Sequence, residues 1–139
     1  MVNIEDLVYT KVRTAVKAFN PNITLSGVYN DVPSTIPHVS IEETNNANVT
    51  STIDTSNREF AAELTYTVNI FTNTATAKSD ANAIAEVVSD VFADLGFARS
   101  MKQRMPNIDR TIYRLTMRFV AVASKAYDGV EGHYNITAR

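Results

Sequence analysis

The sequence contains no cysteine and no tryptophan among its 139 residues, and it has only four glycines, four prolines and two histidines. The absence of cysteine excludes disulfides and thiolate metal sites, so nothing in the chain depends on an oxidising compartment. The few glycines form no phosphate-binding loop, and the sequence has no nucleophile elbow and no pair of histidines at metal-binding spacing. We therefore expect no catalytic residue, no cofactor and no metal.

The chain also lacks a surplus of basic residues and any long apolar run. Its formal net charge is -2 and its pI is about 5.6, whereas proteins that bind nucleic acid irrespective of sequence carry a basic surplus. No stretch reaches the roughly 18 apolar residues of a membrane-spanning helix. Acidic Glu5 and Asp6 lie where a signal peptide would be basic and then apolar. We expect one compact domain that binds no membrane, makes no specific contact with nucleic acid and stays in the compartment where it is made.

What the sequence does contain is a strong alternation of apolar and polar residues in two stretches, residues 59–72 and 111–123. Alternation with a period of two is typical of strands in a sheet that has one buried face. The residues predicted to point into the core are Phe60, Ala62, Leu64, Tyr66, Val68 and Ile70 in the first stretch, and Tyr113, Leu115, Met117, Phe119 and Ala121 in the second.

Two other stretches, residues 4–19 and 80–95, repeat apolar residues every three or four positions and predict amphipathic helices. Candidate cap residues are Asn3 for the first helix, and Ser79 or Thr76 followed by Gly96 for the second. Shorter strands are predicted at residues 23–29, 38–42 and 97–105. The resulting order, α-β-β-β-α-β-β, predicts an α+β two-layer sandwich. Its antiparallel or mixed sheet of about five strands has both helices on one face.

Residues 1–123 therefore form a single predicted domain, interrupted by one long polar loop. Residues 44–57 are rich in Asn, Thr and Ser, and their only large apolar residues are Val49 and Ile53. Two such side chains are too few to form a core, so we expect a flexible loop. Because a loop of this length in a compact domain usually has a task, Val49 and Ile53 are candidate contacts with a partner.

The last part of the chain, residues 124–139, is also thin in apolar residues. It contains two glycines and scattered larger side chains, among them Tyr127 and Tyr134. This composition predicts an extended C-terminal arm that docks on a neighbour or is mobile. Tyr127 and Tyr134 are the candidate contacts of this arm.

Charged residues recur on the face of the predicted sheet that points away from the core. Glu59 and Glu63 lie on one strand, and Arg110, Arg114 and Arg118 lie on another. If the two strands are neighbours, these charges pair across the sheet, where each exposed pair contributes about 0.2 to 1 kcal/mol. One interpretation is an ordinary solvated face. The functional interpretation is a polar interface between subunits, with Glu59, Glu63, Arg114 and Arg118 setting the register by charge complementarity.

A local group of basic residues surrounds the turn between the last two predicted strands. It consists of Arg99, Lys102, Arg104 and Arg110. This patch would suit a phosphate or an acidic partner, but no aromatic residue is interleaved for stacking on bases. A hairpin rim with solvated charges is the simpler interpretation.

The remaining polar residues indicate no chemistry. His38 follows a proline at a strand entrance and His133 lies in the predicted arm, and the sequence proposes no partner that would orient either as a base. Glu42, Glu43 and Asp54 offer oxygen ligands for a hard cation, but their spacing matches no known cation loop. A solvated strand end is the simpler interpretation of the two glutamates.

The succession of elements resembles a known family. It comprises a helix at the chain start, the turn and strand of residues 32–43 (VPSTIPHVSIEE), a polar loop, the strand of residues 60–71, the helix of residues 80–95, and the strand YRLTMRF at residues 113–119. In this order, over roughly residues 4–123, the chain resembles the tail terminator, or tail completion, proteins of long-tailed bacteriophages.

The resemblance implies a small α+β virion subunit that forms a ring, expected to be a hexamer, on the head-proximal end of the tail tube. The ring would stop tube polymerisation, meet the head-tail connector and let DNA pass, and it would be assembled in the cytoplasm of the host bacterium. The resemblance implies no cofactor and no catalysis, and it suggests that the polar loop or the C-terminal arm reaches the tube or the connector.

Two alternatives to a terminator stay open. Another neck protein, for head closure or head-tail joining, would share this composition and habit of assembly. A ferredoxin-like module that binds a small molecule would also place two helices on one sheet, but it is expected to have a polar or glycine-rich loop that lines a pocket, and none is evident. An enzyme would require a deep pocket with convergent titratable groups.

Overall fold

The computed structural model describes residues 2–29, 33, 35–48, 61–125 and 134–137. The elements are, in chain order, α1 Glu5–Phe19, β1 Thr24–Ser26, β2 His38–Asn48, β3 Ala61–Thr72, α2 Ala77–Leu95, β4 Ala98–Met105, β5 Tyr113–Lys125 and β6 Tyr134–Thr137. The predicted order of two helices and five strands is present, followed by one further short strand. The prediction of an α+β fold is confirmed.

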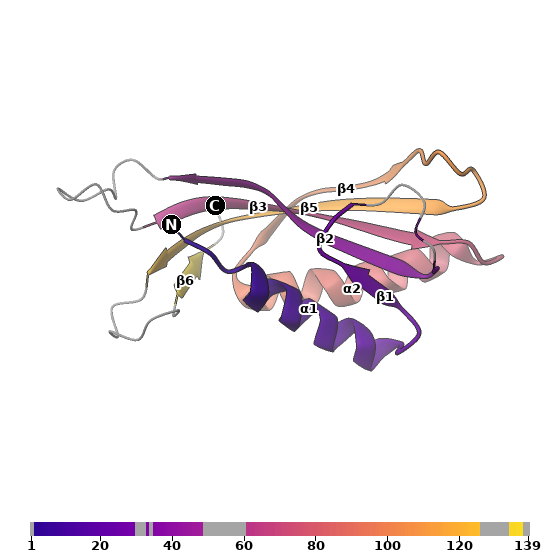
Figure 1. Ribbon diagram of the computed structural model, residues 1–139, viewed down its shortest axis with the longest axis horizontal. Helices are drawn as coiled ribbons and strands as arrows, with labels where there is room; N and C mark the ends of the chain where they lie inside the picture. The colour runs from indigo at the N-terminus through magenta and orange to yellow at the C-terminus, as the bar shows by residue number, and fades with distance from the viewer. Residues whose placement is uncertain (1, 30–32, 34, 49–60, 126–133, 138–139) are drawn as a thin grey trace.

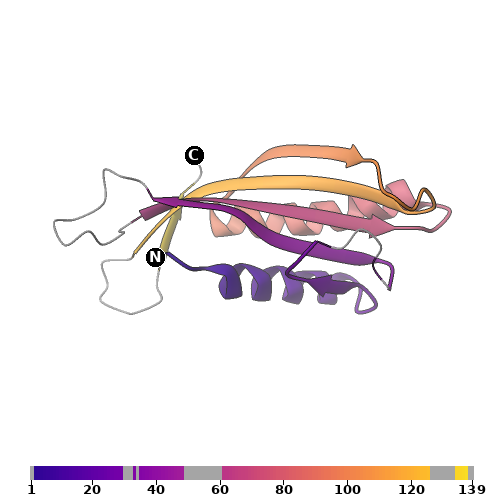
Figure 2. The same ribbon diagram turned by 45° about the horizontal axis from the view of Figure 1, so that its top comes forward.

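The strands form one mixed sheet with both helices on the same face (Figures 1 and 2). The strand order is β1-β2-β3-β5-β4, and β6 pairs with β5 beyond the end of β4. Strand β1 is parallel to β2, and every other described pair is antiparallel. The helix-covered side is called the core face below, and the opposite side is called the polar face.

The alternation of the two long strands gives the predicted core face. In β3 the side chains of Ala62, Leu64, Tyr66, Val68 and Ile70 are buried, and in β5 those of Leu115, Met117, Phe119 and Ala121 are buried. The intervening residues point to the polar face. Because β3 and β5 pair along twelve residues at the centre of the sheet, their apolar side chains form a continuous floor for the helices.

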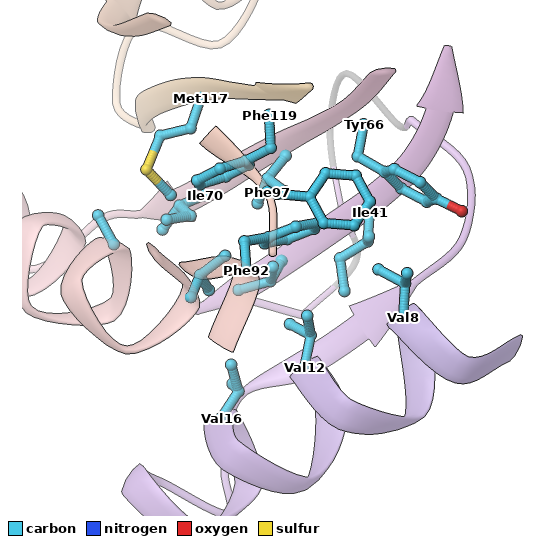
Figure 3. Packing of buried hydrophobic residues seen from close by; sticks show 14 of the residues in the cluster. Val8, Val12, Val16, Ile41, Tyr66, Ile70, Phe92, Phe97, Met117 and Phe119 are labelled. Atoms are coloured by element: carbon cyan, nitrogen blue, oxygen red, sulfur yellow. The ribbon is translucent and has the colours of Figure 1, made fainter. Parts of the chain in front are cut away.

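Each helix buries one stripe of apolar side chains on this floor (Figure 3). The buried residues of α1 are Val8, Val12 and Val16, and those of α2 are Ala81, Ile84, Ala85, Val88 and Phe92. The Phe92 ring stacks on the Phe119 ring with their centroids 4.2 Å apart, and the Phe97 ring meets Phe92 edge to face at 5.2 Å. Offset stacking and edge-to-face contacts are the favoured geometries of aromatic pairs, so this cluster anchors α2 to the sheet.

The ends of α2 follow from local chemistry. Thr76 is the N-cap, and the hydroxyls of Thr74 and Thr76 donate to the Asp80 carboxylate in the first turn, where a negative charge is favoured. Gly96 ends the helix with a φ of +101°, a left-handed conformation that glycine adopts without strain. A Cβ at Gly96 would collide with the carbonyl oxygen of Ile136 in β6. The glycine therefore lets the end of α2 and the last strand approach closely.

Two segments differ from the sequence-based expectation. Strand β2 continues to Asn48, so residues 44–48 of the expected loop form a strand that pairs with β3 after a bulge between Glu43 and Asn45. Their polar side chains do not oppose pairing, because the ladder uses backbone groups, and Asn46 Nδ2 also donates to the Val2 carbonyl oxygen at 2.8 Å. The rest of that expected loop, residues 49–57, lies outside the described residues.

The described part of the expected C-terminal arm also belongs to the sheet. Residues 134–137 form β6, which pairs with β5 of the same chain, and β5 itself extends to Lys125. The absence of a side chain at Gly96 leaves room for this short strand to pack against the end of α2. The sequence pattern could not predict this long-range contact. Neither described helix has the length and apolar composition of a membrane-spanning segment.

Candidate functional site

Arg114 and Asn69 form the centre of a polar cluster on the polar face. Arg114 Nε donates to Asn69 Oδ1 at 2.9 Å, and Thr116 Oγ1 donates to the same oxygen at 2.7 Å. The side chains of Asn69 and Thr116 are buried although they lie on the face away from the helices. The Arg114 guanidinium lies over the ring of Tyr29, 4.6 Å from its centroid, which is a cation-π geometry. Arg114, a predicted interface residue, is thus engaged by its own subunit.

The segment after β1 covers this end of the polar face. The Tyr29 ring lies 6.2 Å from the Phe71 ring, and Phe71 is fully buried. The His38 ring, on the neighbouring strand β2, lies 6.1 Å from the Phe71 ring. Sequence reasoning missed this small second core, because the alternation assigns Phe71 to the polar face. A large apolar residue on that face was the one available signal that part of the face is buried.

His38 is a structural residue within this second core. Its Nδ1 lies 2.6 Å from Thr24 Oγ1 and its Nε2 lies 3.0 Å from Ser26 Oγ, whose hydroxyl also donates to the Val28 carbonyl oxygen. A neutral ring satisfies both contacts, with Thr24 donating to Nδ1 and Nε2 donating to Ser26. Burial lowers the pKa of His38 from its usual 6.5, which favours the same neutral form. The geometry ties β1 to β2 and places no second titratable group beside the ring within the described residues.

The register of β3 and β5 does not place Glu63 opposite an arginine, and Glu59 lies outside the described residues. Strands β3 and β5 are neighbours, as the hypothesis required, but Arg118 lies opposite Thr67 and Glu63 lies opposite Val122. Arg114 lies opposite Phe71, so Glu63 faces neither arginine. For Glu63 the predicted pairing with Arg114 or Arg118 is wrong, because sequence alternation specifies a face and leaves the register between strands open. Arg118 remains an exposed cation on the polar face.

A second group of polar residues lies where α1 begins beside β2. The Tyr66 hydroxyl donates to Glu43 Oε1 at 3.1 Å, and a pocket of about 260 Å³ opens there between Glu43, Glu5 and Tyr9. Burial raises the pKa of Glu43 above its usual value, and a hydrogen bond to Glu5 raises it further. Burial together with the neighbouring Glu43 also raises the pKa of Tyr66.

The two adjacent glutamates of β2 do not share a cation. Glu42 lies opposite Thr67 on the polar face, whereas Glu43 lies opposite Tyr66 on the core face. Asp54, the third expected ligand, lies outside the described residues. Among the residues that the structure describes, no group of three or more acidic or histidine side chains is arranged to hold a metal ion.

The basic residues predicted as one patch lie along strand β4. Arg99, Lys102 and Arg104 are exposed, and the register places them opposite Phe119, Met117 and Leu115, so all three belong to the core face beside α2. Arg104 lies over the Tyr113 ring, 5.0 Å from its centroid. Arg110, also exposed, lies in the following turn. Three of the four predicted residues therefore form a row along the edge strand β4, and only Arg110 lies in the turn.

One further pocket lies at the opposite end of the helices. It has a volume of about 280 Å³ and lies between the end of α1 and the start of α2, with Phe19, Pro37, Ile84 and Asp80 in its wall. Phe19 is 51% exposed there. Asp80 is the one titratable side chain among the described residues of this wall.

Several predicted contact residues fall outside the part of the chain that the structure describes. They are Glu59, Val49, Ile53 and Tyr127, together with His133. Tyr134 is described as the first residue of β6, where its backbone is paired with Lys125. Its role as a contact with another subunit stays a prediction.

Comparison with known proteins supports the fold. No protein-family model matches the sequence, and no curated protein matches it. Among solved structures, the chain is similar to one in the virion of a native gene transfer agent particle, with a TM-score of 0.58 and 20% sequence identity. The match covers 81% of this chain and 88% of that one. At this identity the similarity shows a shared fold over most of both chains.

Proposed function

We propose that the protein is a structural component of a phage-like virion, namely a tail terminator that forms a ring on the head-proximal end of the tail tube. The observation that carries the proposal is the fold shared with a gene transfer agent virion chain over most of both lengths. The terminator role itself rests on the succession of elements that resembles that family.

The surfaces of the molecule suit repeated contact with copies of itself. The polar face carries exposed Arg118, and one edge of the sheet carries exposed Arg99 and Lys102. On the opposite side of the sheet, acidic side chains gather around Glu43 of β2. Such a polar surface favours specific orientation of subunits, because mismatched charges penalise wrong arrangements.

The proposed partners are other copies of the chain, the tail tube protein and the head-tail connector. The ring, expected to be hexameric, would form in the bacterial cytoplasm and let DNA pass without reading its sequence. The net charge of -2 agrees with a channel that does not grip DNA. Residues 49–57 and 126–133 are the candidate segments for contact with the tube or the connector.

Negative-stain electron microscopy tests the terminator role. Purified protein is mixed with tail tubes of the phage that encodes it, and the position of added density is scored on each tube. We expect density at one end only. Density along the tube, or bare ends, would refute the terminator role, and attachment to isolated heads in the absence of tubes would point to a head-closure protein.

A further inference from the structure

The β4–β5 connection, residues 106–112, presents one apolar and one cationic side chain to solvent. Ile108 is 76% exposed, more than any other large apolar side chain that the structure describes, and Arg110 is also exposed. A single exposed apolar residue is common on protein surfaces and by itself indicates no contact. Here it lies two positions before a cation, on a connection that several hydrogen bonds hold in one shape.

Hydrogen bonds within the β4–β5 connection fix the backbone that carries these two side chains. Asp109 Oδ1 accepts from the backbone N of Thr111 at 2.9 Å and from its hydroxyl at 2.6 Å, and Ile112 N donates to the Asp109 carbonyl oxygen at 3.2 Å. Ile112 itself is buried and anchors the end of the connection. Because Ile108 and Arg110 flank Asp109, their backbone is already ordered in the free subunit. A preorganised group loses little conformational freedom when it binds.

The pocket between the end of α1 and the start of α2, called the α1–α2 pocket below, has the complementary composition. Its volume is about 280 Å³, and Phe19, Pro37 and Ile84 give it an apolar wall beside the Asp80 carboxylate. Phe19 is 51% exposed, so part of this wall is uncovered in the isolated subunit. A partner that suits this pocket carries an apolar side chain and a cation close together.

Two threonines that precede α2 hold the Asp80 carboxylate in place. Thr74 Oγ1 donates to Asp80 Oδ2 at 2.5 Å, and Thr76 Oγ1 donates to the same oxygen at 3.2 Å. A carboxylate has about four acceptor positions, so Asp80 can still accept from a guanidinium. In the described part of the chain, neither Asp80 nor Arg110 forms an ion pair. The two charges are thus available to each other when two copies meet.

The connection and the pocket lie at the same end of the molecule but on different parts of it (Figures 1 and 2). The connection follows the edge strand β4, whereas the pocket lies where β2 begins and β3 ends, at Pro37 and Thr72. Ile108 is not part of the pocket wall, and its exposure shows that it does not fill the pocket of its own subunit. A contact between the two features therefore joins two copies, and the pair still presents one unused connection and one unused pocket.

We propose that the β4–β5 connection of one subunit docks in the α1–α2 pocket of a second copy. Ile108 then packs on the apolar wall, and Arg110 lies beside Asp80. This inference rests on the proposed function, because it names the contact that joins neighbours in the ring. Such a head-to-tail contact repeats from copy to copy and closes when the rotation per subunit divides a full turn. Side chains that fill a pocket of the partner dominate the binding energy of many interfaces, and a charge pair beside them fixes the orientation.

Crosslinking between two single-cysteine variants tests the contact, because the chain has no cysteine of its own. I108C is mixed with A83C, whose residue lies in the pocket wall, and a short thiol crosslinker is added. The two variants carry tags of different size, so a link between unlike copies is distinguished on a gel from a link between like copies. We expect links between unlike copies to exceed links between like copies at least tenfold.

The matched control replaces A83C with A93C. Ala93 is also an alanine of α2, and at 1.5 Å per residue over the ten residues from 83 to 93 it lies about 15 Å further along the helix. Ala93 is exposed whereas Ala83 is half-buried, so random collision would favour the control. Equal linking of I108C to both positions would therefore overturn the inference.

The double variant A83C/I108C tests the head-to-tail direction of the contact. Because each linked pair still presents one connection and one pocket, crosslinking should give a ladder of products up to the full ring. A product that stops at the dimer would show two copies that exchange their connections reciprocally. A link within one copy would show that the connection reaches its own pocket. Either result would overturn the proposed contact.

Substitutions give an independent measurement. I108S and R110D should each lower the fraction of rings at least tenfold by mass photometry, and D80R/R110D should restore the rings that R110D loses. K102D is the matched control for net charge, because Lys102 is an exposed cation on β4 of the same hairpin, and it should keep its rings. Equal losses in R110D and K102D would overturn the pairing of Arg110 with Asp80. Circular dichroism confirms folding, and if D80R fails to fold, I108S together with the crosslinks still decides the question.

The outcomes, measured with and without tail tubes, separate this inference from the proposed function. Rings that form, or cap tubes, without linking I108C to A83C and without sensitivity to I108S would overturn the contact and leave the terminator role standing. Undecorated tubes together with linked rings that I108S disrupts would overturn the terminator role and leave the contact standing. Protein that stays monomeric with and without tubes would overturn both.

Discussion

Replacing Gly96 with alanine is expected to destabilise the protein by two separate effects. Gly96 has a φ of +101°, and an alanine held in a left-handed conformation costs about 1–2 kcal/mol. Its Cβ would also collide with the Ile136 carbonyl oxygen, so β6 must shift away from the end of α2. Strand β6 has four residues paired with β5, and each of their hydrogen bonds contributes roughly 1 kcal/mol net. Loosening β6 loses this contribution but regains chain entropy, so the cost is about 1–2 kcal/mol.

The two effects together predict a loss of about 2–4 kcal/mol in the free energy of unfolding of Gly96→Ala. At about 2.1 cal/mol/K per residue, unfolding a chain of 139 residues has an entropy near 0.3 kcal/mol/K, so Tm should fall by about 7–14 °C. Urea denaturation measures the free energy, and hydrogen exchange measures protection of the β6 amides. We expect protection of residues 134–137 to decrease more than that of β3.

Gly96→Asn separates the two effects. Asparagine tolerates the left-handed conformation better than alanine but carries the same Cβ, so it should be more stable than Gly96→Ala by several tenths to about 1 kcal/mol and should still loosen β6. If both variants lose less than about 0.5 kcal/mol and β6 stays protected, the close approach of Gly96 and Ile136 is not a feature of the folded protein.

Three other changes test the core and the buried titratable groups. Glu43→Gln should raise stability at pH 7, because burial raises the folded-state pKa of Glu43. The wild-type glutamate then contributes stability below its usual pKa of 4.5 and loses that contribution as pH rises through the raised value, so the gain should shrink toward pH 4.5 in urea titrations. His38→Gln should lose less stability than the wild type as pH falls below about 6.5. The folded-state pKa of His38 is lowered, so the neutral ring contributes stability above that pH and this contribution is lost on acidification. An unchanged slope of stability against pH would contradict the burial of His38. Phe92→Ala should lower the free energy of unfolding by about 3–5 kcal/mol through the cavity beside Phe119, whereas Phe92→Leu should cost clearly less; equal and small losses would show that the aromatic cluster does not anchor α2.

The faces of the candidate surfaces were predictable from the sequence, and their neighbours were not. Alternation placed Arg118 and Glu63 on the polar face, which the structure confirms, but it could not say which residue of β3 meets which residue of β5. When two strands shift against each other by an even number of residues, each side chain stays on the same face of the sheet. The alternation pattern therefore contains no information about such a shift.

Polar segments show the same division. Residues 44–48 have too few apolar side chains to predict a strand, yet they extend β2 because β3 offers its backbone groups at that edge. Residues 134–137 become a strand because β5 is longer than β4 and leaves room beside it. In both cases pairing with a distant strand supplies the stabilisation that local composition lacks.

The sequence by itself determined the two helices, the order of the main strands and the side of the sheet that is buried, because these follow from the period of apolar residues along a short segment. Only the tertiary structure decided the strand registers, the second core around Phe71 and the packing of β6 against Gly96. These features depend on contacts between residues far apart in the chain, and local periodicity does not record them.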